Sequence, residues 1–179
     1  MQNIQVLKLS RTKEIIFSAV FTAMAVYAPM LVHYFGGVDA GRKFLPMPFF
    51  VLLAGFLLGW RTGLATGLFS PIVSYLISGM PMLPVLPIII IQLSFLGLIS
   101  GIMKSKYNVW LSLTVAIIAS WFAMGIAVYF FSSMSVIEFL ISAAKDGWIG
   151  IVIQVIVLPI AVKYFSGFPW SLSASGGRE

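Results

Sequence analysis

The chain has 179 residues, of which 60% are hydrophobic and 9% charged, and its mean hydropathy is +1.06. Soluble domains carry about a quarter charged residues, so this composition excludes both a water-soluble globular protein and an intrinsically disordered one. With no Cys and one His the sequence offers no disulfide, thiolate or multi-histidine metal site, and its formal net charge of +6 does not indicate nucleic acid, because the cations are scattered and form no basic stripe.

Apolar runs predict six membrane-spanning helices, since a helix needs about 20 apolar residues to cross the hydrocarbon core. The first run covers residues 15–32. The second begins near Phe44 and the third ends near Ile77, with Gly59, Arg61 and Gly63 between them. A charge flanked by glycines predicts a tight turn there. The other runs cover 84–103, 109–131 and 148–162, of which the last is short and can take length from the segment before it.

The charges predict the orientation of this all-α bundle. Six crossings place both termini on one side, and that side carries eight cations against three on the other. The positive-inside rule then places both termini in the cytoplasm. The eight are Lys8, Arg11, Lys13, Arg61, Lys104, Lys106, Lys163 and Arg178, and the three are Arg42, Lys43 and Lys145. We expect a single six-helix transmembrane domain over residues 1–170 and a polar tail over 171–179.

The loops on the outer side are predicted to be longer than those on the cytoplasmic side. They cover residues 33–43, 78–83 and 132–145. Because long loops carry function more often than short ones, we expect recognition to take place at the outer face.

The inventory of reactive side chains does not favour an enzyme. The one histidine, His33, lies at the outer end of the first run, and the sequence has neither a GxSxG motif nor a P-loop. No acid falls inside the predicted membrane layer, which disfavours a proton relay. A transporter built from this chain would therefore take its energy from a partner or from ion coupling.

Three polar or aromatic residues are predicted at one depth. Gln92 follows Pro84 by eight residues, about 12 Å below the outer boundary, and Gln154 follows Trp148 by six, about 9 Å below it. Trp121 is about 18 Å from the inner boundary, which leaves about 12 Å to the outside. Ser94 and Ser120 lie close to this layer. Two amides and an indole suit a small, mostly neutral organic ligand. Equally, each amide could bond a neighbouring helix while Trp121 faces lipid.

Two further residues are candidates at the mouth of this site. Arg42 lies in the first outer loop, where it can form a lid that attracts an anionic group or act as an ordinary headgroup-level charge. Trp148 begins the last run, where it can contact a ligand or anchor the helix at the interface.

Small residues recur at helical spacing and are expected to serve mostly in helix packing. Ala19 and Ala23 lie on the first run, and Gly97 and Gly101 on the fourth. The third run carries Gly63, Gly67, Ser70, Ser74 and Ser78, and the fifth Ala119, Ala123 and Ala127.

Several motifs in this order resemble the substrate-binding membrane subunit (S component) of energy-coupling factor (ECF) vitamin importers. They are Ala19-x-x-x-Ala23 after a basic lead, the segment LLAGFLLGWRTG over 52–63, SGMP over 78–81, and GIVIQ over 150–154 followed by Leu158-Pro159. The resemblance implies a multi-pass protein of the prokaryotic cell membrane that binds a water-soluble vitamin or precursor without a cofactor.

The resemblance also implies partners. Ala19 and Ala23 would dock onto a transmembrane coupling subunit (T component), two cytoplasmic ATPases would drive the complex, and the S component would topple to release its ligand. Related sequences often carry an acid where Gln92 stands and an Arg near Ser120 and Trp121. Both are absent here, so the vitamin is not identified.

Two alternatives stay open at this point. A self-sufficient secondary transporter or facilitator would move its solute without partners. A structural membrane subunit would bind no ligand and use its glutamines only to join helices.

Overall fold

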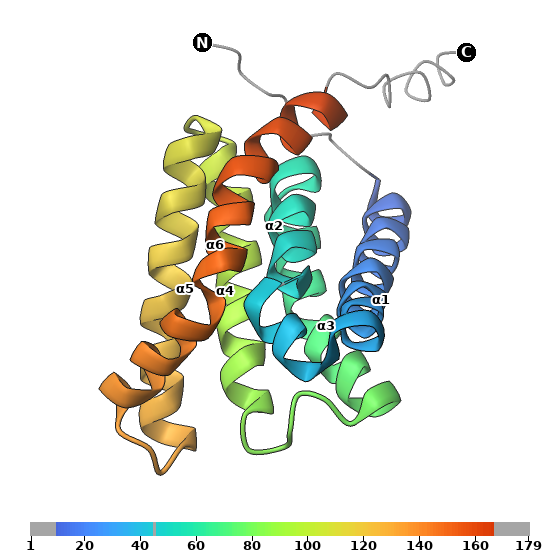
Figure 1. Ribbon diagram of the computed structural model, residues 1–179. Coiled ribbons are helices and arrows are strands. Elements are labelled where there is room, and N and C mark those ends of the chain that lie inside the picture. The colour runs from blue at the N-terminus through green and yellow to red at the C-terminus, as the bar shows by residue number, and fades with distance from the viewer. Residues whose placement is uncertain (1–9, 45, 167–179) are drawn as a thin grey trace, which may run out of the picture.

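The computed structural model describes residues 10–44 and 46–166, except for the side chains of 38–42 and 166. Within these residues the chain is helical, without a strand, and forms six helices (Figure 1). They are α1 (Arg11–Phe44), α2 (Pro46–Leu58), α3 (Trp60–Ser78), α4 (Leu86–Lys104), α5 (Val109–Phe131) and α6 (Val136–Ser166). The all-helical class and the order of six helices are therefore confirmed. The tail over 171–179 lies outside the described residues.

The predicted breaks between the second and fifth helices are also confirmed. Gly59, with φ 94°, is the single residue between α2 and α3. This left-handed region favours glycine, which explains the tight turn. Residues 79–85 separate α3 from α4, and residues 105–108 separate α4 from α5. The side chain of Asn108 caps α5 by accepting a 2.8 Å hydrogen bond from the backbone N–H of Leu111.

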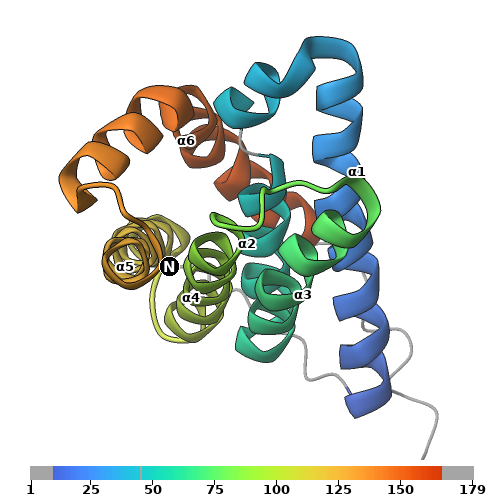
Figure 2. The ribbon, with the colours of Figure 1, turned by 90° about the horizontal axis from the view of Figure 1, so that it is seen from below.

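The prediction of a first outer loop over residues 33–43 is wrong. Helical structure continues to Phe44 and is interrupted at Gly37, where φ is 73° and ψ is −177°. Only glycine adopts this combination readily, so the chain turns at this residue and then resumes a helix. In Figure 2 the segment after the break leaves the axis of the rest of α1.

The prediction of a third outer loop over residues 132–145 is wrong as well. It is shortened to residues 132–135, because α6 begins at Val136 and runs for 31 residues. Val136, Phe139, Leu140 and Ala143 recur at helical spacing and pack against α5. Burial of this apolar face favours a helix here although charged residues lie on its other side.

Four helices are long and apolar enough to cross a membrane, and they occupy Arg11–Gly37, Leu86–Lys104, Val109–Phe131 and Val136–Phe165. With 13 residues α2 is about 20 Å long, which is less than a hydrocarbon core of about 30 Å. The six crossings and the cytoplasmic termini therefore remain predictions.

Glycines bring α2, α3 and α4 into backbone contact. A Cβ placed on Gly63 or Gly97 would collide with the carbonyl oxygen of the other, and a Cβ on Gly101 would collide with the backbone of Trp60. A Cβ on Gly67 would collide with the carbonyl of Leu93. The expected packing role of these small residues is confirmed, and the three helices form the tightly packed centre of the molecule.

The buried apolar residues form two clusters along the bundle. The larger lies among α2, α4, α5 and α6 and contains Val51, Leu52, Leu53, Phe56, Leu93, Leu96, Leu113, Ala116, Leu158 and Val162. The smaller contains Ile88, Met124, Ala127 and Val128, and the first turns of α6 pack on it. Along α4, α5 and α6 the predicted site residues Gln92, Ser120 and Gln154 lie in the chain between residues of the smaller cluster and residues of the larger one.

Candidate functional site

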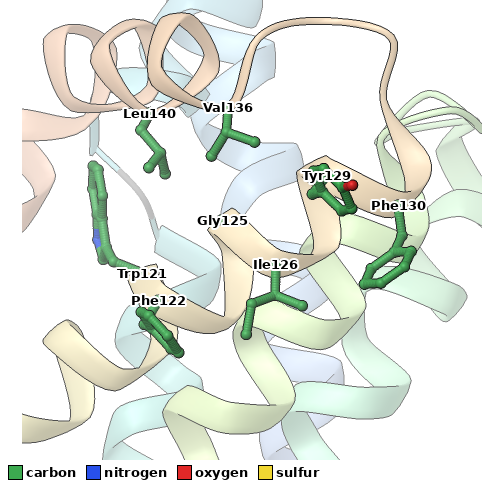
Figure 3. A pocket seen from close by; sticks show the side chains of 8 residues that line it. All are labelled: Trp121, Phe122, Gly125, Ile126, Tyr129, Phe130, Val136 and Leu140. Atoms are coloured by element: carbon green, nitrogen blue, oxygen red, sulfur yellow. The ribbon is translucent and has the colours of Figure 1, made fainter.

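A groove of about 390 Å³ lies between the second half of α5 and the first turns of α6. Figure 3 shows Val136 and Leu140 pointing from α6 toward Gly125 of α5, with Trp121 at one end. The full lining is Trp121, Phe122, Gly125, Ile126, Tyr129, Phe130, Val136 and Leu140. These residues are almost wholly apolar, so the groove suits a hydrophobic group and offers little hydrogen bonding beyond the indole and the phenol.

Gly125 sets the width of the groove. A Cβ at this position would lie 3.7 Å from side-chain carbons of both Leu140 and Val136, which is ordinary van der Waals contact. Since glycine carries no such atom, the space opposite the first turns of α6 stays open.

Trp121 is the one predicted site residue that lines the groove. It is half-buried and packs on the smaller apolar cluster. Gln154 is only 3% exposed and has an interaction within the structure, and Gln92 is half-buried on α4. Neither amide is among the groove's lining residues. The structure thus gives Trp121 a groove to which neither predicted amide contributes.

The two predicted serines differ in their hydrogen bonds. Ser120 is buried and donates a 2.8 Å hydrogen bond to the carbonyl of Ile117 on its own helix. The hydroxyl of Ser94 is buried and has no partner in the described part of the chain. Of the two predicted serines, Ser94 is therefore the one whose hydroxyl has no hydrogen-bond partner among the described residues.

Of the two residues predicted at the mouth of the site, the structure describes the side chain of Trp148 and not that of Arg42. Trp148 is 59% exposed on α6, as an interfacial anchor or a ligand contact requires. Arg42 belongs to the last part of α1, and its side chain lies outside the described residues.

A column of buried hydroxyls on α3 was not predicted as part of a site. Thr62, Thr66 and Ser70 are fully buried, and their hydroxyls have no partner among the described residues. The spacing of four residues places them along one side of α3, and that spacing is visible in the sequence. Their burial in a tightly packed interface is not.

The outward face of α1 carries small residues at its centre. Ala19 and Ala23 are both exposed, whereas Thr22, Ala25 and Val26 on the opposite face are buried against the bundle. The exposed face continues in large apolar residues, namely Ile15, Ile16, Val20, Met24, Tyr27 and Leu31. Two alanines one turn apart let another helix approach closely.

An ion pair joins the N-terminal turn of α1 to the bundle. The carboxylate of Glu14 lies 3.7 Å from the guanidinium of Arg61, which also lies over the ring of Trp60 at 5.3 Å. The first turn of α1 is thereby joined to the turn between α2 and α3.

A comparison with protein families gives a match over most of the chain. Residues 13–167 match the family model described as ECF transporter, substrate-specific component. No curated protein and no solved structure gives a match. The matched segment begins in the first turn of α1 and extends past the end of α6.

Proposed function

This chain belongs to the substrate-specific components of ECF transporters, and we propose that it captures a small water-soluble vitamin or precursor at the outer face of the membrane. It is a multi-pass membrane protein and a transporter subunit. In the proposed cycle it delivers the solute to the cytoplasm together with a transmembrane coupling subunit and two cytoplasmic ATPases, because the chain itself has no P-loop.

The observation that carries this proposal is the exposed face of α1. Ala19 and Ala23 lie at the centre of an apolar face that no other part of the described chain covers. Helices associate in lipid through close packing of small residues, so this face suits a helix of the coupling subunit. The rest of α1 is held on the bundle by its buried side and by Glu14, which leaves the docking face outermost.

The test is co-purification of the complex from cells that express all subunits. Ala19→Trp is expected to abolish recovery of the coupling subunit and ATPases, because an indole would separate the two helices. Ile118→Trp is the matched control, since Ile118 is 64% exposed on α5 and lies on a different helix. A complete complex recovered with Ala19→Trp would remove the docking assignment.

The solute site is proposed in the layer between the two apolar clusters. Gln92, Trp121 and Gln154 with Ser94 and Ser120 would contact the solute, and Arg42 and Trp148 would lie at its mouth. The groove beside Trp121 and the hydroxyl of Ser94, which has no partner in the described part of the chain, support this placement. Native mass spectrometry of the gently purified chain would identify a retained molecule.

The same purified chain distinguishes the proposed function from the two alternative functions. Uptake by the purified chain alone in liposomes would identify a self-sufficient transporter or facilitator. A chain that retains no molecule and moves none would be a structural subunit, in which Gln92 and Gln154 only join helices.

A further inference from the structure

Lys104, the last residue of α4, is buried although it carries a charge. It is 4% exposed, and no ion pair or hydrogen bond joins its ammonium to another residue in the described part of the chain. Lysine is rarely buried to this extent unless an anion pairs with it. The field of the helix C-terminus compensates the desolvation of an ammonium only in part. The burial of Lys104 therefore calls for an anion that the described residues do not supply.

The side chain of Lys104 faces the turn between α2 and α3. Ser100 and Gly101, one turn earlier, lie on either side of its direction on α4. A Cβ on Gly55 of α2 would collide with the hydroxyl of Ser100, and a Cβ on Gly101 would collide with the backbone of Trp60, the first residue of α3. Because Lys104 is the next residue on this side, it lies where α2 ends and α3 begins.

The first turn of α3 is a second feature that favours an anion at this place. The first backbone N–H groups of a helix have no partner within the helix, and they carry the positive end of its dipole. The N-cap residue, Gly59, has no side chain to accept their hydrogen bonds, and the first turn of α3 contains no acidic residue. Such a helix end binds phosphate and other anions. Lys104 adds a full positive charge beside it.

Glu14 is a carboxylate that already lies close to this turn. It pairs with the guanidinium of Arg61 at 3.7 Å, and it forms no ion pair with Lys104. The side chain of Arg61 is 58% exposed, so this fork of N–H donors is also accessible to a further anion. One carboxylate and two cations leave an excess positive charge among these three residues.

The length of α4 places Lys104 at the level of the lipid headgroups. This candidate span has 19 residues, or about 28 Å, which is close to a hydrocarbon core of about 30 Å. Its two ends therefore lie at the two boundaries of the core, and Lys104 is at one of them. Trp60 beside it is 44% exposed, as is typical of aromatic residues at a membrane interface.

We propose that Lys104, Arg61 and the first N–H groups of α3 bind a phosphate group, supplied by the headgroup of an anionic phospholipid. The oxygens of one phosphate can accept hydrogen bonds from the ammonium, the guanidinium and the backbone at once. The predicted orientation places Lys104 at the cytoplasmic leaflet, where anionic lipids are found and where basic pockets between membrane helices bind their headgroups. This site is separate from the proposed solute contacts and from the docking face of α1.

Native mass spectrometry of the purified full chain in detergent tests the site, with phosphatidylglycerol added at a fixed ratio. Lys104→Met keeps an unbranched side chain and removes the charge, and it is expected to reduce the retained phosphatidylglycerol about tenfold. Lys106→Met is the matched control, because Lys106 lies two residues later and is exposed. We expect the control to stay within about twofold of the wild-type chain. Equal retention by all three proteins, or an equal loss in both variants, would overturn the proposal.

Thermal unfolding provides a second measurement and distinguishes two sources of phosphate. Phosphatidylglycerol is expected to raise the unfolding midpoint of the wild-type chain and of Lys106→Met but not of Lys104→Met, since a ligand stabilises only a form that binds it. A rise that depends on Lys104 with inorganic phosphate, and none with phosphatidylglycerol, would assign the site to a free oxyanion and overturn the lipid as its source. No rise with either would overturn the phosphate site itself.

The Lys104 variant is expected to fold, because an apolar side chain in place of an unpaired buried charge is favourable. Lys104→Gln takes its place in both experiments if the methionine variant does not fold. Neither measurement involves the coupling subunit or the transported solute, so this proposal and the proposed function fail separately.

Discussion

At the scale of single residues, the contact between Gly63 and Gly97 decides how closely α3 and α4 approach. The atoms that face each glycine belong to the backbone of the other helix. A backbone cannot move aside without displacing a whole helix, so even one methyl group is unfavourable at this point.

Gly97→Ala is therefore expected to lower the free energy of unfolding by about 3 kcal/mol. Gly125→Ala provides the matched control, because its Cβ would lie 3.7 Å from the side chains of Leu140 and Val136. Alanine has a higher intrinsic helix propensity than glycine, which offsets the new contact. We therefore expect the control to change the free energy of unfolding by less than about 1 kcal/mol. Denaturant titration in detergent measures both, and equal stability of the two variants would show that α3 and α4 are not in backbone contact.

Buried hydroxyl groups in the bundle fall into two groups, those with a hydrogen-bond partner and those without one among the described residues. Ser120 satisfies its hydroxyl with the carbonyl of Ile117, whereas the hydroxyls of Ser94 and Thr66 are buried without a partner in the described part of the chain. A buried polar group without a partner is unfavourable, and such groups are often retained for a bound molecule or water. Ser94 is thus a stronger candidate for solute contact than Ser120.

At the scale of elements, α1 and α6 depart from the simple crossings that hydropathy predicts. Each is longer than a bilayer core requires, with 34 and 31 residues. In α1 the extra length is separated by the break at Gly37. In α6 it forms the first turns, which pack on α5.

The break in α1 depends on glycine. Gly37 combines φ 73° with ψ −177°, whereas Gly79 combines φ 71° with ψ 5°. Asn tolerates the second conformation but not the first. Gly37→Asn is expected to cost about 2 kcal/mol, and Gly79→Asn less than about 1 kcal/mol.

Thermal unfolding of the two asparagine variants measures this difference. Among the described residues, no atom lies within 4 Å of a Cβ placed at either glycine, so steric contact with these residues does not contribute. Equal unfolding midpoints would indicate that α1 can continue through Gly37 without the break.

At the scale of the whole molecule, orientation follows from the charges at the two ends of the bundle. Ser105 lies in the loop between α4 and α5, and Ser133 in the loop between α5 and α6; both are exposed. The positive-inside rule assigns the first loop to the cytoplasm and the second to the outside.

Single cysteines at these serines test the orientation. Ser133→Cys is expected to react with an impermeant thiol reagent added to intact right-side-out vesicles. Ser105→Cys is expected to react only after permeabilisation, because the bilayer separates it from the reagent. The reverse pattern would contradict the orientation and would place the termini on the outer side of the membrane.

The whole bundle combines a rigid centre with less tightly packed outer elements. Backbone contacts among α2, α3 and α4 are fixed by glycines, while α5 and the first turns of α6 leave a groove between them. Solute recognition is proposed along α4, α5 and α6, and partner docking on the outward face of α1. Apart from Arg42 on the last part of α1, the proposed solute contacts lie on other helices than the docking face, so a variant at Ala19 is expected to leave solute binding intact.

The amino-acid sequence by itself determined the class of protein, the order of six helices and the turn at Gly59, because hydropathy and glycine placement act locally along the chain. It also determined that Gly63 and Gly97 serve packing, and its motifs pointed to the family that the comparison confirms. The shared depth of Gln92, Trp121 and Gln154 follows from helical rise alone, yet it does not say which side chains line a cavity.

Only the tertiary structure decided where α6 begins and which faces are covered. Glu138, Lys145 and Asp146 lower the average hydropathy of residues 136–147, so a linear count assigns them to a loop. In three dimensions burial acts on one face at a time, and Val136, Leu140 and Ala143 hold the helix on α5 whatever its opposite face carries. The same reason explains why the groove at Trp121 and the exposure of Ala19 could not be obtained from the sequence: both depend on which neighbouring helix covers a given face.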